Sequence, residues 1–330
     1  MIRLSKVLAI IISSALLFSF SGCQLSSSNG ELDASPPRVA LIMQGPISDM
    51  AWNASAYKGL TKIEKIGAEV EYQENVGLNS VGDIIKAYGE DGVNIVFLAT
   101  NGYEETVCQI APSYPKTQFV IMNGEQTKGN VFSTQIADEE QGYMMGVISA
   151  IATRSNKVGF VGGSDILPIV NGQKGFEQGV KYVDDSIEIF ADTLDNFKNI
   201  NQAKDISVEF IKNGVDVICP ICDQSAIGVI DAAEEYQIMS VCSGSEQENA
   251  AIKSGLIAVE KDTSIAYDST FKKILANELG NTIQKIGAKD GAIYLSNWFS
   301  ASSILSEEDK AFVEETFEKL KSGEIIINLD

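Results

Sequence analysis

The sequence predicts an α/β protein with two Rossmann-like lobes, each built on a parallel β-sheet, and a ligand cleft between the lobes. Two observations lead to this fold class. Short apolar runs alternate along the chain with segments of helical spacing, which is the pattern of repeated β-α-β units. The alternation also restarts after Arg154, at a strand predicted for Lys157–Val161. Two separate sheets are therefore expected.

The first series of strands alternates with helical segments such as the one marked by Ala56, Leu60 and Ile63. The run Val93–Ala99 is apolar in the way expected of a strand that is buried on both faces. The predicted strands of this series are Arg38–Gln44, Ala68–Tyr72, Val93–Ala99, Gln118–Met122 and Asn130–Ile136.

The second series continues to the end of the chain. Helices are predicted over Phe176–Val183 and Asp262–Gly280, and a last helix begins at a capping box formed by Ser306–Asp309 and stops at Gly323. The predicted strands of this series are Lys157–Val161, Ile187–Ala191, Val215–Cys219, Met239–Cys242 and Ile257–Val259.

The N-terminus has the layout of a lipoprotein signal. Arg3 and Lys6 precede an apolar stretch, Val7–Phe18, that is shorter than the roughly 20 residues of a transmembrane helix. Small residues then lead to Cys23, as in a bacterial lipobox. We expect a signal peptide at 1–22, cleavage before Cys23 and lipidation of its thiol. The alternative is an uncleaved anchor helix, which leaves the same domain outside the membrane.

The segment 23–37 is rich in Ser, Asn, Gly and Pro. Such a segment buries too little apolar surface to order itself, so it is predicted to be a flexible tether. After this tether we expect an N-terminal lobe made of 38–141 plus about 243–262. A C-terminal lobe is expected from 142–242 plus about 263–330.

Composition narrows the function. The net charge of −20 disfavours nucleic acid as a partner, because phosphate contacts need Lys and Arg. The chain has no histidine, which excludes Ser-His-Asp and Cys-His mechanisms and any His-ligated metal. We therefore expect a binding protein rather than an enzyme, with no cofactor and no metal.

Four cysteines follow Cys23, namely Cys108, Cys219, Cys222 and Cys242. In an exported protein an even number permits disulfides, and the C-x-x-C spacing of Cys219 and Cys222 could support redox chemistry. The alternative is that they are small buried apolar residues at strand ends, and this is the interpretation that we favour.

In open α/β sheets the ligand binds at the carboxyl ends of the strands. The residues that follow the first strand include Asp49, Trp52 and Asn53. Trp52 offers a stacking face and Asn53 an amide that both donates and accepts, which suits a planar heterocycle. The alternative is that Asp49 caps the next helix and Trp52 packs in the core.

Later strands add further candidates. Asn101 and Glu105 follow Val93–Ala99, although acidic residues at a helix start are also explained by the helix dipole. Lys261 follows the strand at Ile257 and could donate to sugar hydroxyls, or it could be a solvated surface residue.

Four further motifs stand out along the chain: Trp52-Asn53 after the opening RVALIMQ strand, Glu140–Gly146, Lys157–Gly163 and Gly175–Val180. In these motifs the chain resembles the basic membrane protein family of substrate-binding lipoproteins, which includes purine nucleoside receptors. The resemblance implies a periplasmic-binding-protein type I fold with three crossovers between the lobes. It also implies delivery of the ligand to an ABC permease and ATPase.

The resemblance further implies roles for single residues. Trp52-Asn53 matches the aromatic–Asn pair that contacts the base, Glu105 (or Glu104) is the nearest match to an acidic base contact, and Lys261 matches a Lys that holds ribose. Two departures concern the second lobe. Cys219–Gln224, which contains Asp223, lacks the second aromatic residue. Gly244 occupies the position at which the family has a ribose-binding Asp. Glu246 could take the role of that Asp.

Together these features predict a monomeric, lipid-anchored protein on the extracytoplasmic face of the cell membrane. Its predicted role is to capture a nucleoside-like ligand for an ABC importer. The alternative is a regulatory or sensory lipoprotein of the same fold with a diverged ligand.

Overall fold

The computed structural model describes residues 35–48 and 52–330. The predicted signal peptide at 1–22, the lipidation site Cys23, most of the predicted tether at 23–37 and the candidate Asp49 lie outside the described residues. Within the described part, no helix combines the length and the apolar character that a membrane crossing requires.

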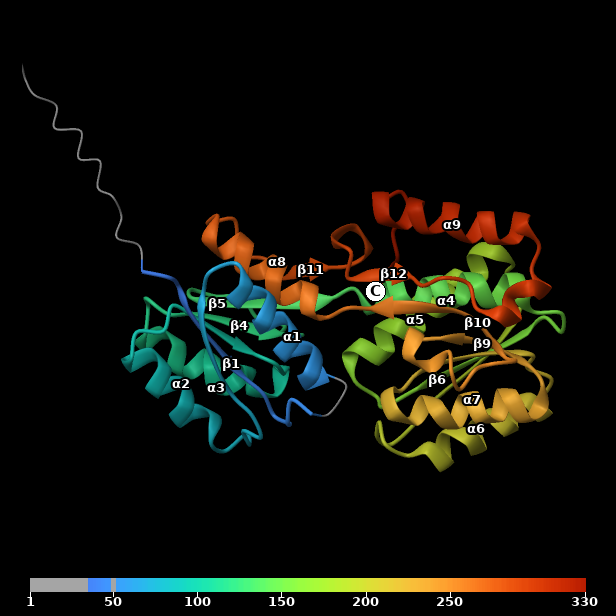
Figure 1. Cartoon of the computed structure of the whole chain (residues 1–330), viewed down its shortest axis with the longest axis horizontal. Helices are drawn as coiled ribbons and strands as arrows, with labels where there is room; N and C mark the ends of the chain where they lie inside the picture. The colour runs from blue at the N-terminus through green and yellow to red at the C-terminus, as the bar shows by residue number, and fades with distance from the viewer. Residues whose placement is uncertain (1–34, 49–51) are drawn as a thin grey trace, which may run out of the picture. The chain divides into compact units, whose positions relative to one another are not determined.

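The first sheet has the strand order β11-β5-β4-β3-β1-β2, and every pairing in it is parallel. Figure 1 shows α2 and α3 on one face of this sheet, with α1 and α8 on the other. The strands are β1 (Arg38–Ile42), β2 (Glu69–Gln73), β3 (Ile95–Leu98), β4 (Gln118–Met122), β5 (Val131–Ile136) and β11 (Gln284–Ile286). The helices are α1 (Trp52–Lys65), α2 (Val81–Glu90), α3 (Glu104–Ile110) and α8 (Ser264–Leu275).

Strand β1 shows why this sheet needs helices on both faces. Successive side chains of a strand point to opposite faces. Val39 and Leu41 accordingly belong to the core cluster that includes residues of α1 and α8, such as Leu60. Ala40 and Ile42 belong to the cluster under α2 and α3.

The second sheet has the order β12-β10-β9-β8-β6-β7, and its pairings are parallel except for the antiparallel edge pair β10–β12. Its strands are β6 (Lys157–Gly162), β7 (Glu188–Thr193), β8 (Val217–Ile221), β9 (Met239–Cys242), β10 (Gly255–Lys261) and β12 (Ile293–Leu295). Its helices are α4 (Asp138–Ala152), α5 (Leu167–Val183), α6 (Ile200–Lys212), α7 (Ala226–Tyr236) and α9 (Glu307–Ser322).

The predicted ends of the last helix are confirmed. The Ser306 hydroxyl accepts from the Asp309 amide at 3.1 Å, and the Asp309 carboxylate accepts from the Ser306 amide at 3.0 Å. This reciprocal pair satisfies two amides at the start of α9. Gly323 ends the helix with φ of 79°, a left-handed conformation that glycine adopts without strain.

The predicted division into lobes needs two corrections. The segment 243–262 was expected in the N-terminal lobe, but it contains β10, which pairs with β9 in the second sheet. The segment from 263 was expected in the C-terminal lobe, but α8 packs beside α1 (Figure 1) and β11 pairs with β5 in the first sheet. The physical reason is that β10 and α8 bury their apolar faces on different sheets, so the chain changes lobes between them.

Within the described residues, the chain consequently crosses between the lobes at three places. The first crossover is Ala137, between β5 and α4; the second is Asp262–Thr263, between β10 and α8; the third is Gly287, after β11. The first and third crossovers lie side by side, because the Ala137 amide donates to the Ile286 carbonyl at 2.9 Å. The three crossovers implied by the family resemblance are therefore present.

Helices α4 and α5 pack backbone against backbone. A Cβ atom added to Gly142 would lie 1.8 Å from the Gly172 carbonyl oxygen, and one added to Gly146 would lie 2.2 Å from that of Phe176. From the other side, a Cβ on Gly175 would lie 2.0 Å from the Glu139 oxygen. The glycines therefore fix how closely the two helices approach.

Candidate functional site

Lys261 and Asp138 join the first and second crossovers. Lys261 ends β10, Asp138 begins α4, and Lys261 Nζ lies 2.7 Å from Asp138 Oδ1. The Lys261 side chain is 22% exposed and that of Asp138 only 5%. Burial alone would lower the pKa of Lys261, but the charges of Asp138 and Asp223 outweigh burial and raise it. Lys261 is therefore a protonated donor held in one place, which is the opposite of the solvated alternative.

The two residues after Asp138 hold the third crossover. Glu139 forms an ion pair with Lys285 of β11. Glu140 accepts from the Ala288 amide at 2.6 Å, just after Gly287. Burial raises the pKa of Glu140. The three consecutive carboxylates at the start of α4 thus each contact a residue close to another crossover.

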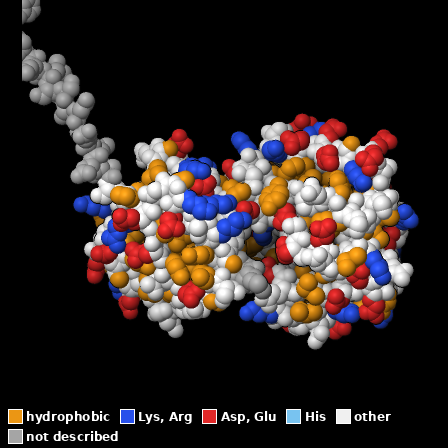
Figure 2. Space-filling model, viewed as in Figure 1, with side chains coloured by type: hydrophobic (Ala, Val, Ile, Leu, Met, Phe, Trp, Pro, Cys, Tyr) orange, Lys and Arg blue, Asp and Glu red, His pale blue; other side chains and the backbone are white. Residues whose placement is uncertain are grey.

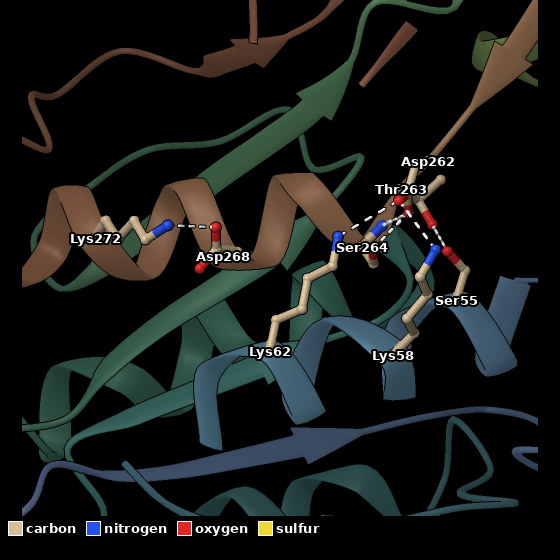
Figure 3. A network of polar contacts seen from close by, with 8 residues as sticks. All are labelled: Ser55, Lys58, Lys62, Asp262, Thr263, Ser264, Asp268 and Lys272. Atoms are coloured by element: carbon tan, nitrogen blue, oxygen red, sulfur yellow. Dashed lines mark hydrogen bonds and ion pairs between the residues drawn. The ribbon is translucent and has the colours of Figure 1, made fainter. Parts of the chain in front are cut away.

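The second crossover is also tied to α1. Asp262 lies 3.0 Å from Lys58 Nζ and 3.4 Å from Lys62 Nζ, and it accepts from the Ser264 amide at 3.1 Å, as Figure 3 shows. Burial would raise the pKa of Asp262, but the Ser264 hydrogen bond and the two lysines lower it. Asp262 therefore remains ionised and anchors the crossover to the N-terminal lobe.

The surface around this anchor is basic in an otherwise acidic chain. Figure 2 shows Lys and Arg side chains gathered over the region of α1 and α8. The lysines of α1 are Lys58, Lys62 and Lys65. Of these, Lys58 and Lys62 contact the Asp262 carboxylate.

A small recess lies beside the first crossover, between the end of β4, β5 and the start of α5. It has a volume of about 10 Å³, room for about one water molecule. Ligand pockets usually have roughly 300–1,000 Å³, so its lining must move apart before a nucleoside-sized ligand fits. The lining residues are Asn123, Gln135, Ile136, Asp138, Leu167, Pro168 and Asn171.

Trp52 and Asn53 lie at the start of α1. The half-buried Trp52 ring packs against the core of the lobe, and its Nε1 donates to the carbonyl of Ala99, just after β3. Asn53 Oδ1 accepts from the Gly45 amide at 3.4 Å, in the loop after β1. Both residues therefore hold the carboxyl ends of two adjacent strands together, and the packing alternative for Trp52 describes part of its role.

The acidic residues of α3 divide into two roles. Glu104 accepts from the amides of Glu125 and Gln126, both at 2.8 Å, and so fixes the segment after β4. Glu105 is exposed, and it accepts from Gln109 Nε2 at 3.5 Å on the same helix. Asn101 is exposed at the start of the 3₁₀ turn that precedes α3. None of the three lines the recess.

Gly244 and Glu246 lie in the turn after β9. A Cβ atom added to Gly244 would lie 2.3 and 2.4 Å from the two carboxylate oxygens of Glu246. The Glu246 carboxylate thus occupies the space of a side chain at position 244. Asp223 follows β8 with φ of 46°, is exposed, and is near enough to Lys261 to raise its pKa.

Sequence reasoning missed Asn123 and Asp138, which both line the recess. The signal that could have found Asn123 is its position directly after the predicted strand Gln118–Met122. Asp138 follows the strand Asn130–Ile136 in the same way, with one residue between them.

Three of the four described cysteines are buried free thiols, namely Cys219, Cys222 and Cys242. Burial raises the pKa of Cys219 and of Cys242 to about 12, and it also raises that of Cys222. A buried protonated thiol is a poor nucleophile, which favours the interpretation that these cysteines are small buried residues at strand ends. Across 35–48 and 52–330, no group of three or more acidic or thiol side chains could hold a metal ion.

Comparisons with known proteins match nearly the whole described chain. The Bmp family model, described as ABC transporter substrate-binding protein PnrA-like, matches residues 37–330. ABC transporter nucleoside-binding protein BmpA of Lactococcus lactis subsp. cremoris is 26% identical over 299 residues, covering 86% of this chain and 82% of that protein. Transcriptional activator protein med of Bacillus subtilis is 26% identical over 258 residues, covering 77% and 78%.

A solved structure of an ABC transporter solute-binding protein from Conexibacter woesei has a TM-score of 0.70 at 19% identity. The match covers 88% of this chain and 98% of that one. This likeness, with the two parallel-dominated sheets, confirms the predicted α/β architecture of periplasmic-binding-protein type I.

Proposed function

Because the chain belongs to the Bmp family of PnrA-like ABC transporter substrate-binding proteins, we propose that it captures a purine nucleoside outside the cytoplasm for an ABC permease and ATPase. The role of this family is to bind a solute for a transporter rather than to transform it. The similarity to the nucleoside-binding protein of Lactococcus supports the choice of ligand.

The observation that carries the proposal is the pair formed by Lys261 and Asp138 at the point where the chain passes between the lobes. A sugar hydroxyl both donates and accepts, and this pair offers one acceptor and one donor. Glu246, in the space beside Gly244, is proposed as a second acceptor. Trp52 and Asn53 are proposed to meet the base from the N-terminal lobe, with Asp49, Asn101 and Glu105 around it and Asp223 on the other lobe.

A binding experiment tests the ligand. Adenosine, guanosine and inosine are screened by thermal shift against sugars and amino acids, and a purine nucleoside is expected to raise the melting temperature. The chain has two tryptophans. A Trp298→Phe variant therefore leaves Trp52 as the single fluorescent reporter, and its emission is expected to change on binding. Response to another ligand class alone would overturn the nucleoside assignment.

Calorimetry on the wild type and on two Trp52 variants tests the contact itself. Trp52→Ala is expected to weaken nucleoside binding by more than about 1 kcal/mol, given the energy of aromatic stacking. Trp52→Phe keeps a ring while it removes the donor to Ala99, so it separates stacking from the hydrogen bond. Equal nucleoside affinity in the wild type, Trp52→Ala and Trp52→Phe would show that Trp52 does not contact the ligand.

We further propose that Cys23 carries the lipid that holds the protein at the extracytoplasmic face of the cell membrane. The sequence before Cys23 motivates this proposal. Mass spectrometry of the detergent phase of a Triton X-114 partition is expected to show a chain that begins at Cys23 and carries acyl groups on it. A chain that keeps residues 1–22 and carries no acyl group would favour the uncleaved anchor instead.

A second candidate function is regulation, which the likeness to a transcriptional activator protein favours. The net charge of −20 disfavours direct contact with DNA. Uptake of radiolabelled nucleoside by a deletion strain separates the two candidates. Loss of uptake supports transport, and normal uptake together with altered transcription supports regulation.

A further inference from the structure

The surroundings of Lys261 have a charge balance that bears on which ligands the proposed site accepts. We propose that Asp138 is a specificity-determining residue, which admits uncharged hydroxylated ligands and excludes anionic ones such as their phosphorylated forms. This inference rests on the proposed function, because it concerns the same site.

The position of Asp138 is the first part of the argument. Among the described residues that line the recess, Asp138 alone is ionisable, and it is 5% exposed. Its carboxylate also contacts Lys261 at 2.7 Å. A ligand that enters the recess and reaches Lys261 therefore meets Asp138 as well.

The charge around Lys261 is the second part. A solitary lysine in a cleft attracts phosphate, but here the charge of Lys261 is balanced by Asp138. Asp223 adds a second carboxylate, close enough to raise the pKa of Lys261. An anionic ligand would bring one more negative charge to a site that has no unbalanced cation among these residues, which is unfavourable where burial weakens screening.

At the two helix starts that border the recess, the backbone offers an anion little compensation. Helix N-termini usually attract anions through free amides. The first turn of α4 already holds three carboxylates, Asp138, Glu139 and Glu140. At the start of α5, Pro168 has no amide hydrogen, and the amides of Ile169 and Val170 donate to the Ile166 carbonyl at 2.9 and 3.0 Å.

Hydrogen-bond chemistry leads to the same ligand class. An ionised carboxylate only accepts and an ammonium only donates. A hydroxyl satisfies both groups at once, whereas a phosphate or carboxylate ligand satisfies Lys261 but repels Asp138. The pair therefore selects hydroxyl groups by charge as well as by geometry.

The test uses two ligands of equal shape that differ in charge, adenosine 5′-carboxamide and adenosine 5′-carboxylate, with adenosine and its 5′-monophosphate beside them. Affinities are measured by calorimetry on the full chain. The wild type is expected to prefer the carboxamide over the carboxylate by more than about tenfold. Asp138→Asn keeps the shape of the side chain and is expected to reduce this preference by about tenfold.

The matched control is Asp268→Asn. Asp268 also forms a 2.7 Å ion pair, with Lys272, but on the outer face of α8 and away from the recess lining. Asp268→Asn is expected to keep the wild-type preference for the carboxamide over the carboxylate. Asp138→Glu is expected to keep it too, because it retains the negative charge. Circular dichroism and thermal melting check that each variant folds.

The outcomes separate the inference from the proposed function. If the wild type binds the carboxamide and the carboxylate equally, the inference is wrong but the proposed function stands. This comparison needs only the wild type, so it remains valid even if Asp138→Asn does not fold. An unchanged preference in a folded Asp138→Asn protein also overturns it. A wild type that binds no nucleoside in any form overturns the proposed function, and the inference with it.

Discussion

Lys261 and Asp262 are neighbours in the chain, yet each forms its ion pair in a different environment. Lys261 pairs with Asp138, and the two side chains are 22% and 5% exposed. Asp262 is 14% exposed, but its partner Lys58 is 60% exposed. The first pair joins two crossovers beside the recess, whereas the second ties one crossover to the outer surface of α1.

The comparison teaches that exposure of the partners, rather than distance, decides what each pair does. Exposed pairs contribute about 0–1 kcal/mol and are screened by salt. Removal of one partner from a buried pair costs about 3–5 kcal/mol, because the other charge is left uncompensated. The buried pair is therefore suited to select the kind of ligand that binds. The exposed pair is suited only to hold a crossover more or less firmly against α1.

The largest effect is expected for Lys261→Met, which leaves the Asp138 carboxylate buried without its cation. We expect a loss of about 3 kcal/mol in the free energy of unfolding, measured by urea denaturation at pH 7. Lys272→Met is the matched control, since Lys272 forms a pair of equal length on a helix surface, and it should cost about 0.5 kcal/mol. Equal losses in the two variants would contradict the comparison.

An intermediate effect is expected for Asp262→Asn, about 1.5 kcal/mol at pH 7 from the loss of charge-assisted hydrogen bonds. The folded state lowers the pKa of Asp262 below its ordinary value of 3.8. Its contribution is thus present above pH 3.8 and is lost as the pH falls through the lower folded value. The stability difference between wild type and variant should therefore shrink in urea titrations below pH 4.

The control for that titration is Asp83→Asn, because the Asp83 side chain is 92% exposed. It should change the free energy of unfolding by no more than about 0.5 kcal/mol, both at pH 7 and below pH 4. A difference between wild type and Asp262→Asn that grows in acid would show that the carboxylate of Asp262 is not held ionised by its neighbours.

The smallest effect is expected for Lys58→Met, because Lys62 remains beside Asp262. The loss should be about 0.5 kcal/mol in low salt and should vanish near 1 M NaCl, where the Debye length is about 3 Å. Urea denaturation at the two salt concentrations measures it. The effect of Lys261→Met should survive the same salt; if both effects vanish, the burial argument is wrong.

Most of the architecture could be predicted from local patterns. The predicted strands Gln118–Met122 and Met239–Cys242 match the structure residue for residue. Short apolar runs bounded by turn residues form strands that are buried on both faces of a sheet, so their ends can be predicted from the local sequence. The assignment of 243–262 and of α8 to lobes could not be predicted in this way. It depends on which sheet buries β10 and α8, and their own apolar patterns fit either sheet.

The site was predictable only in part, for a similar reason. Lys261 was found because it ends a strand, but its partner Asp138 lies 123 residues away along the chain. Glu104 and Glu105 carry the same chemistry in adjacent positions, and only the fold shows that Glu104 binds backbone amides while Glu105 is exposed. Pairings of this kind are set by topology, and a local pattern does not contain them.

The glycine contact between α4 and α5 has a consequence for how much sequence change the protein tolerates. Gly142 and Gly146 touch no proposed ligand contact, yet any side chain at either position must displace the backbone of α5. Since the recess is lined by Asp138 of α4 and by Leu167, Pro168 and Asn171 of α5, that displacement changes the shape of the recess. Mutational tolerance at these glycines should thus be as low as within the site itself, and a screen for ligand response would recover them alongside Asp138.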